Sequence, residues 1–231
     1  MTDLSANSSL RKAALVAGSG LLTMTIFAVA AFTLVFQKLI IPGNASATVN
    51  NILLGEMQFR IGITCLFIVA VLDVVVAWAL YVVLEPAGKN LSLLAAWFRL
   101  VYAAILGVAL FGYAHVLRLL GGAHNMKAAV TGQLHADVML SLQVFDDGWA
   151  IGLVFFGVHL VILGYLVVRS GYAPRILGIV LAIAGAAYVT DSFGRFLFPS
   201  YTLNFATFVG WGEALFMLWL LYKGLKRSKG S

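Results

Sequence analysis

Charged residues are scarce in this sequence: Asp, Glu, Lys and Arg make up only 10% of its 231 residues, whereas hydrophobic residues make up 62%. Soluble domains carry about 25% charged residues, so this composition excludes an ordinary soluble protein. The net charge of +6 comes from scattered and terminal basic residues, which form no patch of the size that binds nucleic acid. We therefore expect an all-α, polytopic integral membrane protein without a nucleic-acid partner.

Residues that commonly hold metals and cofactors are also few. The single cysteine, Cys65, excludes an intrachain disulfide and any cysteine-based zinc or haem motif. The four histidines are spread along the chain and form no His-x-x-x-His motif. Glycine-rich stretches lie in apolar segments, which argues against phosphate-binding loops. The sequence predicts neither a metal nor a cofactor.

Long apolar runs dominate the rest of the sequence. A helix needs roughly 20 apolar residues to cross the hydrocarbon layer. Six runs meet this length and form one membrane domain over residues 1–231, at about 13–36, 58–84, 91–117, 148–168, 175–197 and 204–222. Residues 128–145 are too short and too polar to span, so we expect an interfacial amphipathic segment there. A seventh span around Val138 is the alternative.

Small residues recur in the fourth and fifth predicted spans. They include Gly148, Gly152, Gly178, Ala182 and Gly185. Small side chains let two membrane helices approach closely. The sequence therefore predicts that these two helices form a tight pair.

Five ionisable residues lie within the predicted spans at positions that suggest one site. Counting about 1.5 Å per residue from the cytoplasmic ends places four of them about 12 to 17 Å deep, namely Asp73, Arg99, His159 and Glu213. Asp191 lies on the outer side of this layer, four residues before Arg195. Ionisable groups at such depth need a partner, an aqueous cavity or a function. Asp73 with Arg99, and Asp191 with Arg195, are candidate ion pairs.

A stretch from Phe155 to Ser192 carries a family resemblance. It includes Leu163-Gly164-Tyr165-Leu166, then Ser170-Gly171 with Pro174-Arg175, and finally Tyr188 with Asp191-Ser192. These residues resemble the signature of a bacterial polytopic membrane-protein family, domain of unknown function 4386. The resemblance implies a multi-pass protein of the bacterial inner membrane and implies no activity. His159 departs from the family pattern, which often has an aromatic residue there.

Three function classes follow from these residues. In the first, Asp73, Arg99, His159, Asp191 and Glu213 line an intramembrane polar pocket that binds a lipid or small amphiphile or moves a small solute. In the second, an acid–base enzyme acts on an apolar lipid or isoprenoid substrate, with Glu213, Asp191 and Asp73 as candidate catalytic carboxyls. In the third, every polar group is paired and the protein is a structural or partner-binding subunit. Membrane lipids are the expected partners, and the sequence predicts no oligomeric state.

We expect both termini in the cytoplasm. With six spans, nine basic residues fall on the side of the termini and five on the other, and the basic-rich side faces the cytoplasm. A reporter that is active only in the cytoplasm, fused after Ser231, should therefore be active. An inactive but well-expressed fusion would contradict six spans.

Overall fold

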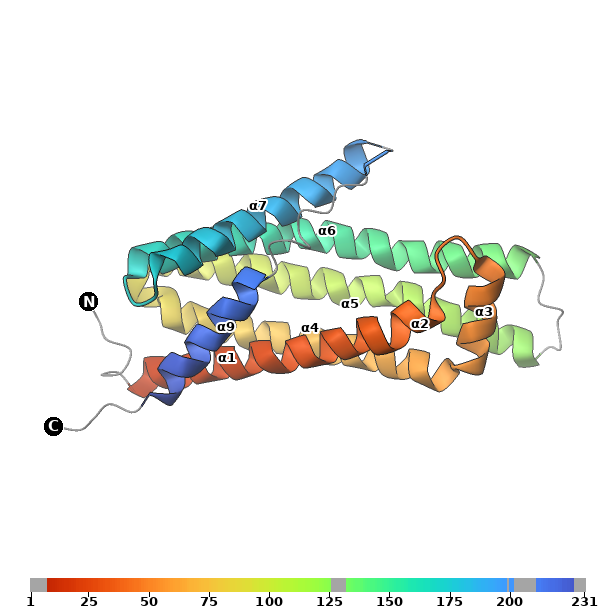
Figure 1. Ribbon diagram of the computed structural model, residues 1–231, viewed down its shortest axis with the longest axis horizontal. Helices are drawn as coiled ribbons and strands as arrows, with labels where there is room; N and C mark the ends of the chain where they lie inside the picture. The colour runs from red at the N-terminus through yellow and green to blue at the C-terminus, as the bar shows by residue number, and fades with distance from the viewer. Residues whose placement is uncertain (1–7, 126–131, 199, 202–210, 227–231) are drawn as a thin grey trace. The chain divides into compact units, whose positions relative to one another are not determined.

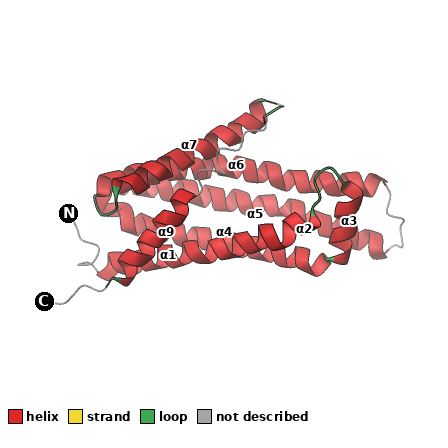
Figure 2. Ribbon diagram, in the orientation of Figure 1, coloured by secondary structure: helices red, strands yellow, loops and turns green. Residues whose placement is uncertain are grey.

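The computed structural model describes residues 8–125, 132–198, 200–201 and 211–226. Within these residues every regular element is helical (Figure 2), which confirms the predicted all-α class. The elements in chain order (Figure 1) are α1 Ser8–Val29, the π-helix η1 Ala30–Phe36, α2 Gln37–Leu39, α3 Ala45–Leu54, α4 Glu56–Leu84, the 3₁₀ turn η2 Glu85–Ala87, α5 Lys89–Asn125, α6 Gly132–Ser170, α7 Arg175–Leu197 and α9 Trp211–Leu225.

Five continuous helical stretches in the described residues are long and apolar enough to cross a membrane. They are Ser8–Leu39, Glu56–Ala87, Lys89–Gly122, Gly132–Ser170 and Arg175–Leu197. Each contains one of the first five predicted spans. The sixth, at about 204–222, is described only from Trp211 onward as α9, and its first residues lie outside the described part.

The predicted interfacial segment at 128–145 is not a separate element. From Gly132 its residues form the first part of α6, which continues without a break through Gly148 to Ser170. No proline interrupts this stretch, and extending a helix costs far less than starting a new one. The alternative of a seventh span around Val138 is therefore wrong, because Val138 and His159 lie on one helix. The segment is polar, yet its backbone is helical and continuous with the fourth predicted span.

A short helix, α3, lies between the first two predicted spans. Asn44 caps it, since its side-chain oxygen accepts a hydrogen bond from the Ala47 N–H at 2.9 Å. Thr48 accepts a further hydrogen bond from the Ile41 N–H at 2.9 Å. These two side chains hold the turn before α3.

Two short connections join helices that bear the polar residues. Between α4 and α5, Ser92 donates a hydrogen bond to the Tyr81 carbonyl at 2.9 Å. Between α6 and α7, Gly171 has φ +67°, a conformation that glycine adopts without strain. Pro174 then occupies the N-cap position of α7, which begins at Arg175. Each connection sets the register of its two helices.

The chain divides into two compact units. The first comprises Met1–Thr23, Leu72–Ala103 and Ala150–Ser231, and the second comprises Met24–Val71 and Ala104–Trp149. Because α1, α4, α5 and α6 each contribute residues to both units, the units are not separate segments of sequence. A single membrane domain stays a prediction.

The first unit contains the tight helix pair that the small residues predicted, formed by α6 and α7 (Figure 1). A Cβ atom on Gly157 would lie 2.6 Å from the Gly185 carbonyl oxygen. One on Gly178 would lie 2.5 Å from the Gly164 carbonyl oxygen. The glycines are seven residues apart on each helix, so they recur on one face. The backbones of α6 and α7 are therefore in direct contact along this face.

Glycines also bring α9 close to the first half of α1 in the same unit (Figure 1). A Cβ atom on Gly18 would lie 2.9 Å from Cγ of Leu221, and one on Gly224 would lie 2.5 Å from Cγ of Leu15. Each helix thus offers a glycine to a leucine of the other. The contact fixes α9, which carries Glu213.

The second unit has an aromatic core. Tyr113 of α5 and Phe145 of α6 stack with ring centroids 3.9 Å apart. Phe36 of η1 and Phe59 of α4 contact the same tyrosine, at 4.7 and 5.4 Å. Such ring pairs add about 0.5 to 1.5 kcal/mol each beyond their buried area.

We expect Gly178→Ala to destabilise the protein. The new methyl group would press on the Gly164 carbonyl oxygen and on the Val168 backbone nitrogen, 2.9 Å away. Overpacking of this kind costs about 1 to 3 kcal/mol, which should lower the melting temperature in detergent. Gly107→Ala is the matched control, because a Cβ atom on this helical glycine meets nothing within 4 Å. Equal melting temperatures for the two variants would show that α6 and α7 are not in backbone contact.

Candidate functional site

Arg99 is at the centre of the candidate site, and Asp73 is its counter-ion. Nη2 of Arg99 lies 2.6 Å from Oδ1 of Asp73, and the two side chains are 2% and 0% exposed. The turn between α4 and α5 explains the match: Asp73 precedes Glu85 by 12 residues and Arg99 follows Ala87 by 12. On two antiparallel helices, equal distances from the turn bring both groups to one level. The predicted ion pair is confirmed.

His159 of α6 joins this pair from a third helix. Its Nε2 lies 3.3 Å from Nη1 of Arg99, and its Nδ1 lies 2.9 Å from the Ala95 carbonyl oxygen. A guanidinium can only donate and a carbonyl can only accept. The hydrogen bonds are therefore satisfied by a neutral His159 that carries its proton on Nδ1. The ring is 1% exposed.

The histidine holds both the backbone and the side chain of one turn of α5. Ala95 and Arg99 are four residues apart, so the Ala95 carbonyl already accepts the helical hydrogen bond of the Arg99 N–H. His159 uses the second lone pair of this oxygen and also accepts from the Arg99 side chain. The rotation of α5 is thereby fixed against α6.

Aromatic side chains that the sequence analysis missed surround the arginine. The Phe156 ring centroid lies 5.4 Å from Cζ of Arg99, which is a cation–π distance. Tyr102 of α5 contacts this ring at 4.8 Å, and Tyr188 of α7 contacts it at 5.7 Å. Phe156 precedes His159 by three residues and Tyr102 follows Arg99 by three. Helical spacing from the ionisable residues was the available signal.

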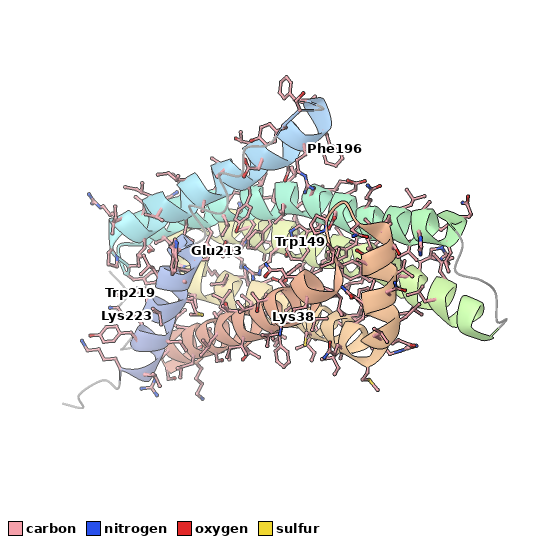
Figure 3. The ribbon with its side chains drawn as sticks, turned by 45° about the vertical axis from the view of Figure 1, so that its right-hand side comes forward. Lys38, Trp149, Phe196, Glu213, Trp219 and Lys223 are labelled. Atoms are coloured by element: carbon pink, nitrogen blue, oxygen red, sulfur yellow. The ribbon has the colours of Figure 1, made fainter. Side chains whose placement is uncertain are left out.

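Glu213 lies in the first turn of α9, with Trp219 and Lys223 farther along the helix (Figure 3). The Tyr188 hydroxyl donates a hydrogen bond to its Oε1 at 3.2 Å. Tyr188 in turn contacts the Phe156 ring, which lies at a cation–π distance from Arg99. Gly212 lets α9 pack on α7 here, since a Cβ atom would lie 2.6 Å from Val180. Glu213 thus belongs to the same cluster of charges, reached through a tyrosine.

The remaining predicted residue, Asp191, contacts a different group. The Tyr201 hydroxyl donates a hydrogen bond to its Oδ1 at 2.7 Å. This bond raises the pKa of Tyr201 because the neighbouring carboxylate disfavours the phenolate. Arg195, the predicted partner, is an exposed residue near the end of α7. A tyrosine hydroxyl therefore contributes to satisfying this carboxylate, and the ion pair with Arg195 stays a prediction.

One buried hydrogen-bond acceptor in the cluster has no described donor. Oδ2 of Asp73 is buried and has no hydrogen-bond donor among the residues that the structure describes. Buried carboxylate oxygens are almost always hydrogen-bonded to protein or to water. An ordered water or a polar group of a ligand can supply this hydrogen bond.

Comparisons with known proteins match the chain to a family model and to a relative. The sequence model of a family described as Domain of unknown function (DUF4386) matches residues 16–224. An uncharacterised protein of Archaeoglobus fulgidus is 37% identical over 164 residues, which cover 71% of this chain and 84% of the relative. No solved structure matches the chain.

We expect Asp73 and Arg99 to be strongly coupled in a double-mutant cycle. Asp73→Asn or Arg99→Gln leaves a buried charge without its counter-ion, which costs about 3 to 5 kcal/mol and should lower the melting temperature in detergent. The double variant should lose much less than the sum of the single losses. The exposed pair of Glu56 and Arg60, 2.7 Å apart, is the control and should couple by less than about 1 kcal/mol. Additive losses at Asp73 and Arg99 would contradict the pair.

Proposed function

The chain belongs to the membrane-protein family described as Domain of unknown function (DUF4386), and we propose that it binds a small cationic amphiphile inside the membrane, with Glu213 releasing a proton as the ligand binds. Carrying that ligand across the membrane in exchange for a proton is the corresponding transport function. Glu213 accepts a hydrogen bond from the neutral Tyr188 hydroxyl, and the neighbouring Asp73 and Arg99 already neutralise each other. This geometry is the observation that supports the proposal.

The charges of the cluster lead to this ligand class. Asp73 and Arg99 cancel each other, and the hydrogen bonds of His159 fit a neutral ring. Glu213 is bonded by a neutral tyrosine hydroxyl at 3.2 Å. An ionised Glu213 therefore leaves the described members of the cluster with one negative charge, which a monovalent cation balances.

The membrane explains why the exchange involves a proton. An isolated carboxylate in an apolar medium is costly, so without a ligand we expect the Glu213 carboxyl to be protonated at neutral pH. A cation that binds beside Glu213 balances the negative charge of its ionised carboxylate. Proton and cation thus compete for one carboxyl. Oδ2 of Asp73 offers a second, hydrogen-bonding contact to a ligand with an N–H or O–H group.

An acid–base enzyme acting on an apolar substrate is the weaker alternative. It needs two carboxyls of different protonation state at the reacting atoms. Asp73 is held by Arg99 and Asp191 by Tyr201, so Glu213 is the carboxyl best placed to act as an acid. The network of Asp73, Arg99 and His159 by itself suits a structural role.

We further infer the setting of this function. The basic residues of the expected cytoplasmic side and the family resemblance favour the bacterial inner membrane with both termini in the cytoplasm. The ligand would then enter from the lipid or from the outer side.

We expect Glu213→Gln to abolish proton release while the protein still folds. Purified protein in weakly buffered detergent would be titrated with tetraphenylphosphonium, a hydrophobic cation, while a pH indicator records released protons. The wild type should release about one proton per bound cation, and Glu213→Gln should release none and bind at least ten-fold more weakly, because the amide carries no charge. The infrared band of a protonated carboxyl should disappear in the same variant.

Glu85→Gln is the matched control. Glu85 also accepts a hydrogen bond from a tyrosine, Tyr81, at 3.4 Å, but it lies at the turn and pairs with Lys89. It should bind the probe and release protons as the wild type does. Binding without proton release by the wild type, or an ionised Glu213 paired with Arg99 in the infrared spectrum, would refute the exchange.

A further inference from the structure

We propose that a groove between α5 and α6 in the second unit binds the headgroup of an anionic phospholipid. The groove has a volume of about 350 Å³ and is lined by Phe111, Gly112, His115, Arg118, Ser141 and Val144. It is separate from the Glu213 site, and the proposal does not depend on the proposed function.

Helix packing forms the floor of this groove. A Cβ atom on Gly112 would lie 2.6 Å from the Ser141 carbonyl oxygen and 2.9 Å from the Phe145 backbone nitrogen. The two backbones are therefore in contact at Gly112. Phe111, His115 and Arg118 follow one another at helical spacing along α5, and Ser141 and Val144 do so along α6. Side chains of both helices thus form the walls.

The groove is positively charged. Arg118 is exposed and has no described counter-ion within its lining, and His115 lies one turn before it on the same helix. None of the six lining residues is acidic. The nearby Asp137 is engaged at its Oδ1 by Gln133 at 2.9 Å. An anion would therefore find a guanidinium and an imidazole and no lining carboxylate.

The polarity of the exposed surface changes along the groove. Val108 and Phe111 are both 64% exposed, and Val144 is 52% exposed. His115 and Arg118 follow within two turns, and Arg118 comes directly after the third predicted span. Exposed apolar side chains followed by basic ones mark the level where a membrane helix leaves the hydrocarbon layer. The basic end of the groove thus lies at the height of lipid phosphates.

This arrangement matches the two parts of an anionic phospholipid. The guanidinium of Arg118 can bind a phosphodiester through two parallel hydrogen bonds, which a lysine cannot do. The acyl chain then continues beside Phe111 and Val144. A zwitterionic lipid brings its own cation to the basic end and gains less from Arg118.

Native mass spectrometry of the full chain in detergent would measure the binding of phosphatidylglycerol and phosphatidylcholine. The wild type should prefer phosphatidylglycerol, and Arg118→Gln should weaken that lipid about ten-fold while phosphatidylcholine binding stays unchanged. Arg118→Lys should bind phosphatidylglycerol with an affinity between those of the wild type and Arg118→Gln. An unchanged melting temperature of Arg118→Lys would show that the fold tolerates substitution at this position. Arg60→Gln is the control, because it removes one positive charge outside the groove.

Three results would overturn the proposal. Equal phosphatidylglycerol binding by the wild type and Arg118→Gln would show that the charge of Arg118 does not contribute to lipid binding. An equal loss in Arg60→Gln would show that net charge alone attracts the lipid. Competition by inorganic phosphate at micromolar concentration would assign the groove to a soluble anion instead.

Discussion

A guanidinium at bilayer depth has to be neutralised where it lies, and this requirement organises the first unit. Arg99 is 2% exposed and cannot lose its charge under physiological conditions. Its pairing with Asp73 joins α4 to α5, its hydrogen bond with His159 joins α5 to α6, and its contact with Phe156 adds an aromatic face. One charge thereby determines how three helices are rotated. The glycine contacts between α6 and α7 in turn position α7, the helix that carries Tyr188.

The sequence allowed depth to be predicted, but not rotation. Counting residues from the two turns placed Asp73 and Arg99 at one level, and the structure pairs them. The same count could not show that His159 contacts Arg99, since a lone histidine in a helix packs equally well in other ways. Tyr102 and Phe156 were missed because aromatic residues are common here, at 13% of the chain, and lipid-facing and buried ones look alike in sequence. In a helix that is apolar all round, periodicity carries little information on facing.

The expected break between the interfacial segment and the fourth span is absent for a related reason. Hydropathy reports the surroundings that residues prefer, whereas helix continuity depends on backbone hydrogen bonding and on the absence of breakers. The first part of α6 is polar at Gln133, Asp137 and Asp146, yet nothing in it interrupts the backbone ladder. The pair of Asp191 with Arg195 was predicted from helical spacing alone, and this spacing could not show that Tyr201, which lies beyond the helix, donates a hydrogen bond to the same carboxylate. Spacing identifies neighbours on one helix and not competitors from another segment.

The closed network around Arg99 also bears on the energy source of any transport. Because Asp73, Arg99 and a neutral His159 have fixed charges, Glu213 is the described member of the cluster whose charge changes during exchange. A site that holds either one proton or one monovalent cation has the same total charge in both states. The electric field across a membrane does about 2.3 kcal/mol of work per charge per 100 mV only on charge that moves. Such an exchange is electrically silent, and the concentration gradients of proton and ligand, rather than the voltage, set its direction.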